Sequence, residues 1–505
     1  MDSGNSAYAT LEGRFRRISH VEGALAVLNW DSAVNMPPGG ADARADQLST
    51  LALTAHEWLT APDMGDLLDA AAEEAAAGAG GLAEPWARAN LDEMRRLWRH
   101  AASVPADLVE AMSKAAHATE MVWREARAAN DWPRLRPHFE NLLGLVRQQA
   151  AAKADAFGLD PYDALLDQYE PGGRAARIDA IFAELAGFLP DLLGRVLEAQ
   201  GRRPAPRLPA GPFPVPAQRA LGERLMRALG FDDAHGRLDV SHHPFTGGVP
   251  DDVRITTRYD EADFARSLMG VIHETGHALY ERGLPGAWRG QPVGAARGMV
   301  LHESQSLLME MQACRAPEFI AFAAPLMHEA FGGDPADWRP DGILCLYQKV
   351  SPGLIRVDAD EVTYPSHVIL RYGIERGLVA GTLAVADLPD AWAEGMQRLL
   401  GIAVPDDRDG IMQDIHWPSG AFGYFPTYTL GAIAAAQLFA AAKAAEPGIL
   451  PGIARGDFAP LLGWLRANVH AAGSSGTTDE ILERATGAPL SAGPYRAHLE
   501  ARYLG

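Results

Sequence analysis

The chain has 505 residues, of which 48% are hydrophobic, and its formal net charge is −20. This composition excludes a disordered chain, because a sequence of this length with ordinary apolar content can bury a large core. The acidic balance repels phosphate backbones, so we expect no nucleic-acid partner.

Cysteine usage and the N-terminal residues indicate where the protein resides. The chain contains two cysteines, Cys314 and Cys345, whereas a secreted scaffold of this size would more often contain several pairs. Residues 1–23 lack the apolar core of a signal peptide. The longest apolar run, near 429–442, is Ala-rich and falls short of the roughly 20 residues of a membrane span. We therefore expect a cytoplasmic protein without membrane attachment.

Helical periodicity fills most of residues 8–200. The segment 131–158 is typical, with Pro133 near its start, Gly158 at its end and apolar residues at helical spacing between them. These apolar residues are Phe139, Leu142, Leu143 and Val146. Alanine, the best helix former, is abundant throughout. The pattern predicts a helical N-terminal region over residues 1–200.

A Pro-rich stretch at 201–217 interrupts this pattern. Its prolines exclude a helix interior, and helices resume directly after it. A surface connection inside one domain is favoured over a linker between two domains. We therefore expect a single helical domain over residues 1–505, in which about 218–505 carry the motifs described below.

Residues 236–259 differ from the rest of the chain. Residues 254–259 are rich in strand-forming types, and Thr246, Gly247 and Gly248 resemble a turn. The segment predicts the main β element of the protein, a small sheet or hairpin. Helical periodicity returns at Asp260, so the expected fold class is mostly all-α with a minor β piece.

Residues 260–283 combine a helical pattern with the motif His-Glu-X-X-His. Asp260 is the expected N-cap and Gly283 the expected end of the helix. His273 and His277 are four residues apart and leave the same helix face. Zinc could therefore take one nitrogen from each, with Glu274 beside the metal but not bound to it. The alternative for this motif alone is a pair of ordinary helix-face histidines.

A catalytic zinc site needs a third protein ligand and one open position. The helical segment 299–313 offers His302 and Glu303, whose side chains point about 100° apart, so one of them is expected to face the metal. Two histidines and one glutamate are typical of hydrolytic zinc sites, which favours Glu303 and leaves His302 in a supporting or core position. Leu307 stands four residues after Glu303, so no acidic residue supports the site there, and the partners that orient the two histidines remain unidentified.

These residues predict metal-dependent hydrolysis. Zinc would acidify a water molecule and polarise a scissile carbonyl, while Glu274 would accept the proton and pass it to the leaving amine. The developing oxyanion would need further donors, from a tyrosine or histidine elsewhere in the chain.

Six short motifs follow one another along the chain. They are HPF at 243–245, DVRIT at 252–256, HETGH at 273–277, HESQ at 302–305, IRVDAD at 355–360 and GIMQDIHW at 410–417. In sequence and order they resemble the signatures of the thermostable, Taq-type zinc carboxypeptidases. Flanking segments at 162–172 and 422–431 are similar as well, and the resemblance extends over essentially the whole chain from 36–39 onward.

The resemblance implies a mostly helical fold with a deep central groove, a homodimer, and a bound zinc ion that cobalt sometimes replaces. It also implies the release of single C-terminal amino acids, with broad specificity, from peptides or unfolded proteins. Residue by residue, His273, His277 and Glu303 match the metal ligands of the family, and Glu274 matches its general base.

A carboxypeptidase must bind a free carboxylate, for which the planar fork of arginine is suited. Arg356 and Arg254 are the arginines inside the motifs, and Arg356 is the favoured candidate. The alternative for Arg356 is an ion-pair network with the acidic residues that follow it, namely Asp358, Asp360 and Glu361. Arg254 could equally pair with Asp252.

Three further motif residues are candidates for substrate contact. His416 and Tyr424 could donate to the oxyanion or to a substrate amide. His243 could line the groove or simply hold the β segment. Two rival functions remain open: a related helical zinc endopeptidase or dipeptidyl carboxypeptidase, and a catalytically inactive peptide-binding protein on the same scaffold.

Overall fold

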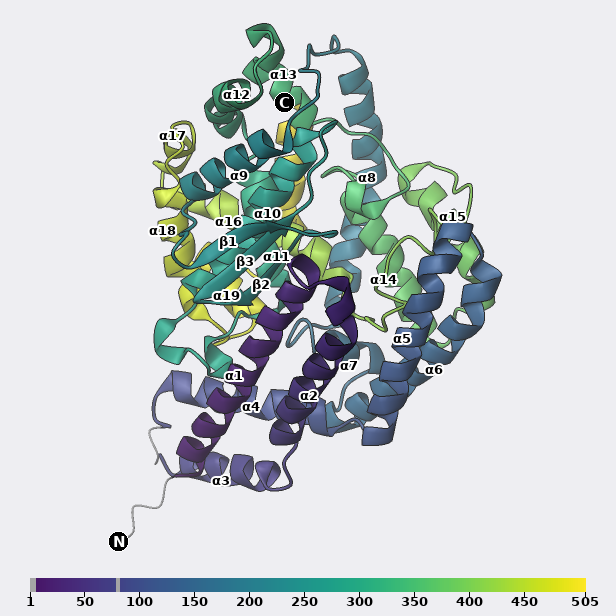
Figure 1. The fold of residues 1–505 in the computed structure, drawn as a ribbon, viewed down its shortest axis with the longest axis vertical. Helices are drawn as coiled ribbons and strands as arrows, with labels where there is room; N and C mark the ends of the chain where they lie inside the picture. Colours follow the sequence, from purple (N-terminus) through teal and green to yellow (C-terminus); the bar gives the residue numbers. More distant parts are fainter. Residues whose placement is uncertain (1–5, 79–81) are drawn as a thin grey trace.

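The protein is built from helices that surround one small sheet (Figure 1). The computed structural model describes residues 6–78 and 82–505. Within those residues the sheet has three strands, so the expected fold class is confirmed. The deep groove implied by the resemblance stays a prediction. None of the helices in the described residues combines the length and the apolar character needed to cross a membrane.

The N-terminal region is helical, as expected. Its helices are α1 (Ala7–Val34), α2 (Ala41–Leu59), α3 (Met64–Ala76), α4 (Pro85–Ala102), α5 (Ala106–Ala129), α6 (Trp132–Phe157), α7 (Pro161–Leu166) and α8 (Ala175–Gly201). Helix α6 has the predicted ends: the Asp131 side chain accepts from the Arg134 N–H at 3.1 Å, and Gly158 closes the helix with a φ of 66°. A small separate core of α1, α3 and α4 includes Leu11, Met64 and Leu68.

The Pro-rich stretch forms neither helix nor strand over 202–214 and is mostly exposed. Its buried residue, Phe213, packs against Phe264 with ring centroids 4.8 Å apart, and its N–H donates to the Glu261 carbonyl at 2.8 Å. This anchoring fits a surface connection. The single domain over 1–505 stays a prediction.

The sheet consists of β1 (Gly236–Val240), β2 (Phe245–Val249) and β3 (Asp252–Thr257), in the order β1-β3-β2. β1 is parallel to β3, and β2 is antiparallel to it. The turn expected at Thr246–Gly248 is wrong, because these residues form the middle of β2. At Gly248, with a φ of 87°, an added Cβ would lie 2.1 Å from the Asp252 carbonyl oxygen, so the glycine permits a tight hairpin ladder. The strand expected at 254–259 starts two residues earlier and ends at Thr257.

The remaining helices are α9 (Val215–Leu229), α10 (Phe264–Gly283), α11 (Gly298–Leu307), α12 (Pro317–Phe331), α13 (Pro340–Tyr347), α14 (Tyr364–Ala380), α15 (Leu388–Leu400), α16 (Pro426–Ala445), α17 (Ile449–Ile453), α18 (Ala459–Asn468), α19 (Thr478–Thr486) and α20 (Ala492–Leu504). The helix expected over 299–313 changes character, because α11 passes into a π-helical turn, η4 (Leu308–Ala313). Residues 401–425 contain no helix or strand.

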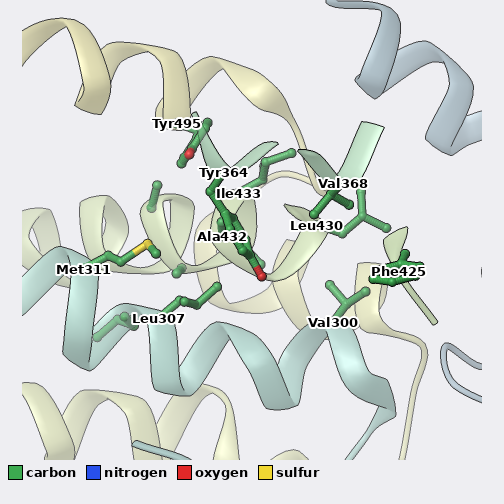
Figure 2. Packing of buried hydrophobic residues seen from close by; sticks show 14 of the residues in the cluster. Val300, Leu307, Met311, Tyr364, Val368, Phe425, Leu430, Ala432, Ile433 and Tyr495 are labelled. Atoms are coloured by element: carbon green, nitrogen blue, oxygen red, sulfur yellow. The ribbon is translucent and has the colours of Figure 1, made fainter. Parts of the chain in front are cut away.

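The largest core surrounds α16, the Ala-rich run noted in the sequence. Leu430, Ile433 and Leu438 are at most 4% exposed, and a helix that is apolar on all sides belongs in a protein interior. Figure 2 shows side chains of α16 meeting those of α11 and α14, with Tyr495 of α20 nearby. Helix α11 therefore lies between α10 and α16, deep in the molecule.

Candidate metal centre and active site

Helix α10 carries the His-Glu-X-X-His motif in the middle of the molecule. Its N-cap is Asp263, whose carboxylate accepts from the N–H groups of Ala265 (3.0 Å) and Arg266 (3.2 Å). The expected N-cap, Asp260, is therefore wrong; its side chain instead accepts from the Ala262 N–H at 2.8 Å. The expected apolar stripe is buried, namely Phe264, Leu268, Ile272 and Leu279. The stripe holds one face of α10 in the core while the motif residues face α11.

Two glycines set the distance between α11 and its neighbours. A Cβ at Gly276 of α10 would lie 2.5 Å from the Gln305 carbonyl oxygen and 2.6 Å from the Ser306 Cα. A Cβ at Gly431 of α16 would lie 2.8 Å from the Glu303 Cβ. Both contacts are closer than van der Waals distance, so only glycine allows α11 to pack this tightly on each side.

The close packing gathers the three predicted donors. One ligand atom each from His273, His277 and Glu303 lie within 4.8 Å of one another. His273 Nε2 is 3.8 Å from Glu303 Oε1, and His277 Nε2 is 3.6 Å from Glu303 Oε2. Two ligands about 2.1 Å from a tetrahedral zinc ion stand about 3.4 Å apart, so the donor set fits such a metal.

Glu310 is a residue that the sequence analysis missed. Its Oε2 is 2.9 Å from His273 Nδ1, which leaves Nε2 of that imidazole directed at the other donors. The other oxygen of Glu310 forms an ion pair with Arg315. Glu310 lies seven residues after Glu303, two helical turns along and close to the same face, and this spacing is the signal in the sequence that points to it.

His302 is adjacent to Glu303 but turned away from the donors. Its Nε2 lies 2.9 Å from Glu281 Oε1, and its ring packs on His277 with centroids 4.6 Å apart. The structure thus places His302 in the supporting position that the sequence analysis gave it.

Glu274 is buried beside the donors. Its Oε2 accepts a hydrogen bond from the Thr246 hydroxyl at 2.7 Å, which ties the carboxylate to strand β2. Burial raises the pKa of Glu274 and that of Glu303, and the nearby His273 opposes the rise at both. Burial by itself would lower the pKa of His273, but the hydrogen bond to Glu310 and the charge of Glu303 outweigh it and raise this pKa to about 10. The site therefore has the negative field that favours a cation.

Arg356 lies in a buried ion-pair cluster. Its Nη2 is 2.8 Å from Asp414 Oδ1, and the Arg371 Nη2 is 2.6 Å from Asp414 Oδ2. Among the described residues, Asp414 is the sole carboxylate within ion-pair distance of either guanidinium. Two arginines thus share one carboxylate, and the cluster keeps one positive charge in excess.

The acidic residues that follow Arg356 have other partners, so the ion-pair network that was the alternative for Arg356 does not form with them. Asp358 pairs with Arg266. Glu361 pairs with His498 at 2.7 Å and Arg502 at 3.0 Å. Asp360 accepts from the main-chain N–H of Val362 at 3.0 Å. The true partner of Arg356 lies in the GIMQDIHW motif, 58 residues away.

His416 and Tyr424 belong to one aromatic cluster with Tyr428, a residue that the sequence analysis did not single out. His416 Nε2 is 3.2 Å from the Tyr428 hydroxyl, and the rings of Tyr424 and Tyr428 are 5.1 Å apart. Arg356 lies over the Tyr428 ring at 4.8 Å. Burial raises the pKa of Tyr424 and raises that of Tyr428 to about 12, and the charge of Glu303 contributes to both. Burial and Arg356 lower the pKa of His416 to about 4, so all three groups are neutral donors near pH 7.

Arg254 and His243 lie apart from this cluster. In the β ladder Arg254 is opposite Gly247, whereas Thr246 is opposite Ile255, so Arg254 and Thr246 leave opposite faces of the sheet. Arg254 pairs with Asp252 at 2.6 Å and stacks on Trp30 at 4.2 Å. His243 is exposed, and its main-chain carbonyl accepts from the Ser241 hydroxyl at 2.6 Å.

Comparison with known proteins places this geometry in a family. Residues 10–503 match the family described as carboxypeptidase Taq (M32) metallopeptidase. Thermostable carboxypeptidase 1 of Thermus thermophilus is 39% identical over 99% of this chain and 98% of its own length. Metallocarboxypeptidase 1 of Trypanosoma cruzi has a similar structure, with a TM-score of 0.96 and 41% identity over 99% of this chain and 100% of that one.

An M32 carboxypeptidase from Deinococcus radiodurans is similar as well, with a TM-score of 0.92 and 38% identity over 98% of both chains. The similarity to these proteins is thus continuous along sequence and fold, beyond the six short motifs. The chain belongs to the M32 family of metallocarboxypeptidases, peptide hydrolases that release C-terminal residues.

Proposed function

We propose that the chain is a zinc carboxypeptidase that releases single amino acids with broad specificity from peptides or unfolded proteins. The observation that carries this proposal is the convergence of His273, His277 and Glu303 beside the buried Glu274. A pair of ordinary helix-face histidines would not bring a third donor and a buried carboxylate to the same place.

The three donors would hold the metal through His273 Nε2, His277 Nε2 and the Glu303 carboxylate. When bound, zinc would supply a lowered pKa for an attacking water and polarisation of the scissile carbonyl, and cobalt could take the same nitrogen and oxygen donors. Glu310 supports the assignment, because its hydrogen bond fixes the His273 ring with Nε2 free for a metal.

Glu274 is the proposed general base. Thr246 holds its Oε2, which leaves Oε1 to accept the proton of the attacking water. The same carboxyl group would then deliver that proton to the leaving amine nitrogen. A carboxylate whose pKa is raised by burial accepts a proton more readily than an exposed one.

Tyr424 and His416 are the proposed donors to the oxyanion, and we add Tyr428 as the group that aligns them. Neutral hydroxyl and imidazole groups in a buried cluster can donate hydrogen bonds to developing negative charge without first losing a proton. Tyr428 contacts both partners, since its hydroxyl lies 3.2 Å from His416 Nε2 and its ring meets that of Tyr424 edge to face, with centroids 5.1 Å apart.

Arg356 is the proposed reader of the substrate's C-terminal carboxylate. The cluster of Arg356, Arg371 and Asp414 has one excess positive charge in a buried setting, which a carboxylate ligand would neutralise. Arg254 is the less favoured candidate, because Asp252 and Trp30 already occupy its guanidinium. His243 remains a weaker proposal for a substrate contact.

A mixed set of peptides, incubated with and without a chelator and analysed by mass spectrometry, tests the activity. We expect fragments shortened one residue at a time from the C-terminus, and no shortening after chelation. Internal fragments or released dipeptides would instead favour an endopeptidase or dipeptidyl carboxypeptidase. Intact peptides in every sample, from protein with full metal content, would favour the inactive binding protein.

The metal assignment has a matched pair of variants in two adjacent residues. Glu303→Ala should lose most bound zinc, measured by elemental analysis, because two histidines leave an incomplete site. His302→Ala should keep about one metal per chain, because His302 contacts Glu281 and stands outside the donor set. The reverse result would transfer the ligand role to His302.

We also propose a homodimer in the cytoplasm. The dimer is supported by the family resemblance alone, and light scattering of the purified protein at several concentrations tests it. The cytoplasmic setting is supported by Cys314 and Cys345, both of which are free thiols. Fractionation of the source cells would test this placement.

A further inference from the structure

Glu375 of α14 is a buried carboxylate that the proposed mechanism does not use. It is 0% exposed and accepts hydrogen bonds from three donors. The Trp417 indole N–H donates to Oε1 at 2.9 Å, and the Tyr162 hydroxyl donates to Oε2 at 2.8 Å. The main-chain N–H of Gly423 also donates to Oε2, at 3.1 Å. A buried carboxylate costs free energy unless hydrogen bonds satisfy it, so three donors directed at one carboxylate in the core indicate a specific role.

The donors of Glu375 mark the two ends of one turn. Trp417 directly follows His416, and Gly423 directly precedes Tyr424. This turn lies within the irregular residues 401–425, where no helical ladder fixes the backbone. Glu375 therefore accepts hydrogen bonds from the residues that directly neighbour His416 and Tyr424, the two proposed oxyanion donors.

The same carboxylate joins the turn to α7. At Gly423, with a φ of 89°, an added Cβ would lie 2.9 Å from the Leu166 nitrogen at the end of α7. Tyr162, near the start of α7, supplies the third hydrogen bond to Glu375. Helices α7 and α14 thus hold the turn from two sides, with the carboxylate between them.

We propose that Glu375 is a positioning residue for the reaction: it clamps the 417–423 turn and thereby sets where His416 and Tyr424 stand. The proposal rests on the donor roles given to these two residues under the proposed function. Glu375 itself touches neither substrate nor metal in this scheme. Its contribution is geometric, and small displacements of a transition-state donor are costly.

The chemistry of the cluster requires a carboxylate. The Trp417 and Gly423 groups can only donate hydrogen bonds. A glutamine in place of Glu375 has one acceptor oxygen and one NH₂ group. In one orientation the amide NH₂ faces the indole N–H of Trp417, and in the other it faces the main-chain N–H of Gly423. In both cases two donors face each other and one hydrogen bond is lost. Glu375→Gln should therefore release one end of the turn while keeping the volume of the side chain.

The first test compares Glu375→Gln with Glu361→Gln. Glu361 is also 0% exposed. It accepts hydrogen bonds from His498, Arg502 and Tyr503 of the C-terminal helix α20 and from Gln312 of η4, and none of these donors lies in the 417–423 turn. We expect Glu375→Gln to lower kcat by about 10²-fold, the loss caused by one misplaced oxyanion donor, with KM and metal content little changed. Glu361→Gln should lose stability but keep kcat. Equal kcat losses in the two variants would overturn the proposal.

Hydrogen exchange gives a readout that does not depend on activity. In Glu375→Gln, exchange should rise in peptides that cover 411–425, and in Glu361→Gln it should rise in peptides that cover α20. A Glu375→Gln variant whose 411–425 peptides exchange like the wild type would contradict the clamp. Tyr162→Phe removes one of the three hydrogen bonds and serves as the milder variant if Glu375→Gln does not fold.

A double variant tests the donor conflict. In Glu375→Gln/Trp417→Phe the amide can turn its NH₂ toward the phenylalanine ring and its oxygen toward Gly423. The double variant should therefore lose no more kcat than Glu375→Gln alone, whereas independent effects would multiply. If the kcat losses of the two substitutions multiply in the double variant, the donor conflict is not the cause of the loss in Glu375→Gln.

Tyr424→Phe separates this inference from the proposed function. If Tyr424→Phe lowers kcat and Glu375→Gln does not, the clamp is wrong and the donor role of Tyr424 stands. If Tyr424→Phe leaves kcat unchanged, the donor assignment fails, and the clamp fails with it as a catalytic device.

Discussion

Two regions of the molecule carry the residues of the proposed site, and they are built in different ways. The metal donors stand on α10 and α11, regular helices in contact along their backbones at Gly276. His416 and Tyr424 stand in the irregular residues 401–425 and Arg356 in a short 3-10 turn, Arg356–Asp358, and buried side chains from distant parts of the chain hold these segments. The first region is rigid because of helix geometry, whereas the second depends on Asp414 and Glu375 as acceptors.

This difference divides the chemistry. The donors must keep one fixed distance from a metal, and the i, i+4 spacing of a helix supplies that distance locally. The groups proposed to face the substrate would have to surround a peptide end, which requires residues from several parts of the chain. We therefore expect variants in the helix pair to affect the reacting centre itself, and variants in the irregular region to affect positioning and recognition.

The largest effect is expected at Glu274. Glu274→Gln should lower kcat by about 10³-fold or more, because the amide fills the same space but cannot accept the proton of the attacking water. Elemental analysis should find the metal retained. Near-normal turnover would remove Glu274 from the mechanism and would weaken the assignment of the chemistry to the helix pair.

Arg356 tests recognition in the irregular region. Arg356→Ala should lose roughly 2–4 kcal/mol in kcat/KM on free-acid peptides, the scale of a charge-assisted pair. The gap between free-acid and C-terminally amidated peptides should narrow. Arg254→Ala is the matched control and should keep that gap. If the gap disappears in Arg254→Ala instead, the recognition belongs to the sheet.

Tyr424 tests whether the irregular region also enters the chemical step. Tyr424→Phe should lower kcat by roughly 10²-fold with a smaller change in KM, because an oxyanion donor acts mainly in the transition state. Steady-state kinetics on one free-acid peptide suffices. A change confined to KM would place Tyr424 in ground-state binding and make the two regions fully separate in role.

The smallest expected effect concerns acid stability of the Asp414 cluster. Burial alone would raise the pKa of Asp414, but Arg371 and Arg356 outweigh it and lower the pKa below the unfolded value. The ionised carboxylate thus stabilises the fold above about pH 4, and this contribution is lost as the pH falls further. The free energy of unfolding, measured with urea in the presence of chelator, should fall by an amount of the order of 2 kcal/mol as the pH is lowered. This fall should be absent from Asp414→Asn. If the free energy of unfolding depends on pH in the same way in the wild type and in Asp414→Asn, this linkage is contradicted.

The sequence predicted the helix pair well because its information is local. His273 and His277 share one helix face by spacing alone, Glu274 lies beside them, and Glu303 follows from the ligand chemistry of zinc. Glu310 was not predicted because it lies two turns after Glu303, in a π-helical turn whose register a regular helical pattern does not give.

The irregular region was predicted less completely, for a physical reason. The alternative weighed for Arg356 was pairing with acidic residues near it in sequence, but its partner Asp414 is brought by the tertiary fold. Nothing in the local pattern assigns Glu375 or Tyr428 to the site, since both resemble ordinary helix residues. The contact of Thr246 with Glu274 was not predicted either. Its glycine neighbours are typical of turns, but in the structure they allow two strands to pair tightly beside Glu274.

The glycines on either side of α11 have a consequence for how the site responds to heat and pressure. At Gly276 helix α10 meets the main chain of α11, and at Gly431 helix α16 meets the root of the Glu303 side chain, with no intervening side chain to change rotamer. Such contacts yield little under compression, because close-packed interiors have low compressibility, and on warming they offer no side-chain rotamers to populate. The spacing of the donors should thus persist over conditions that loosen the turn around Trp417. Under such conditions the enzyme would lose activity because the turn around Trp417 loosens, while its affinity for the metal is retained.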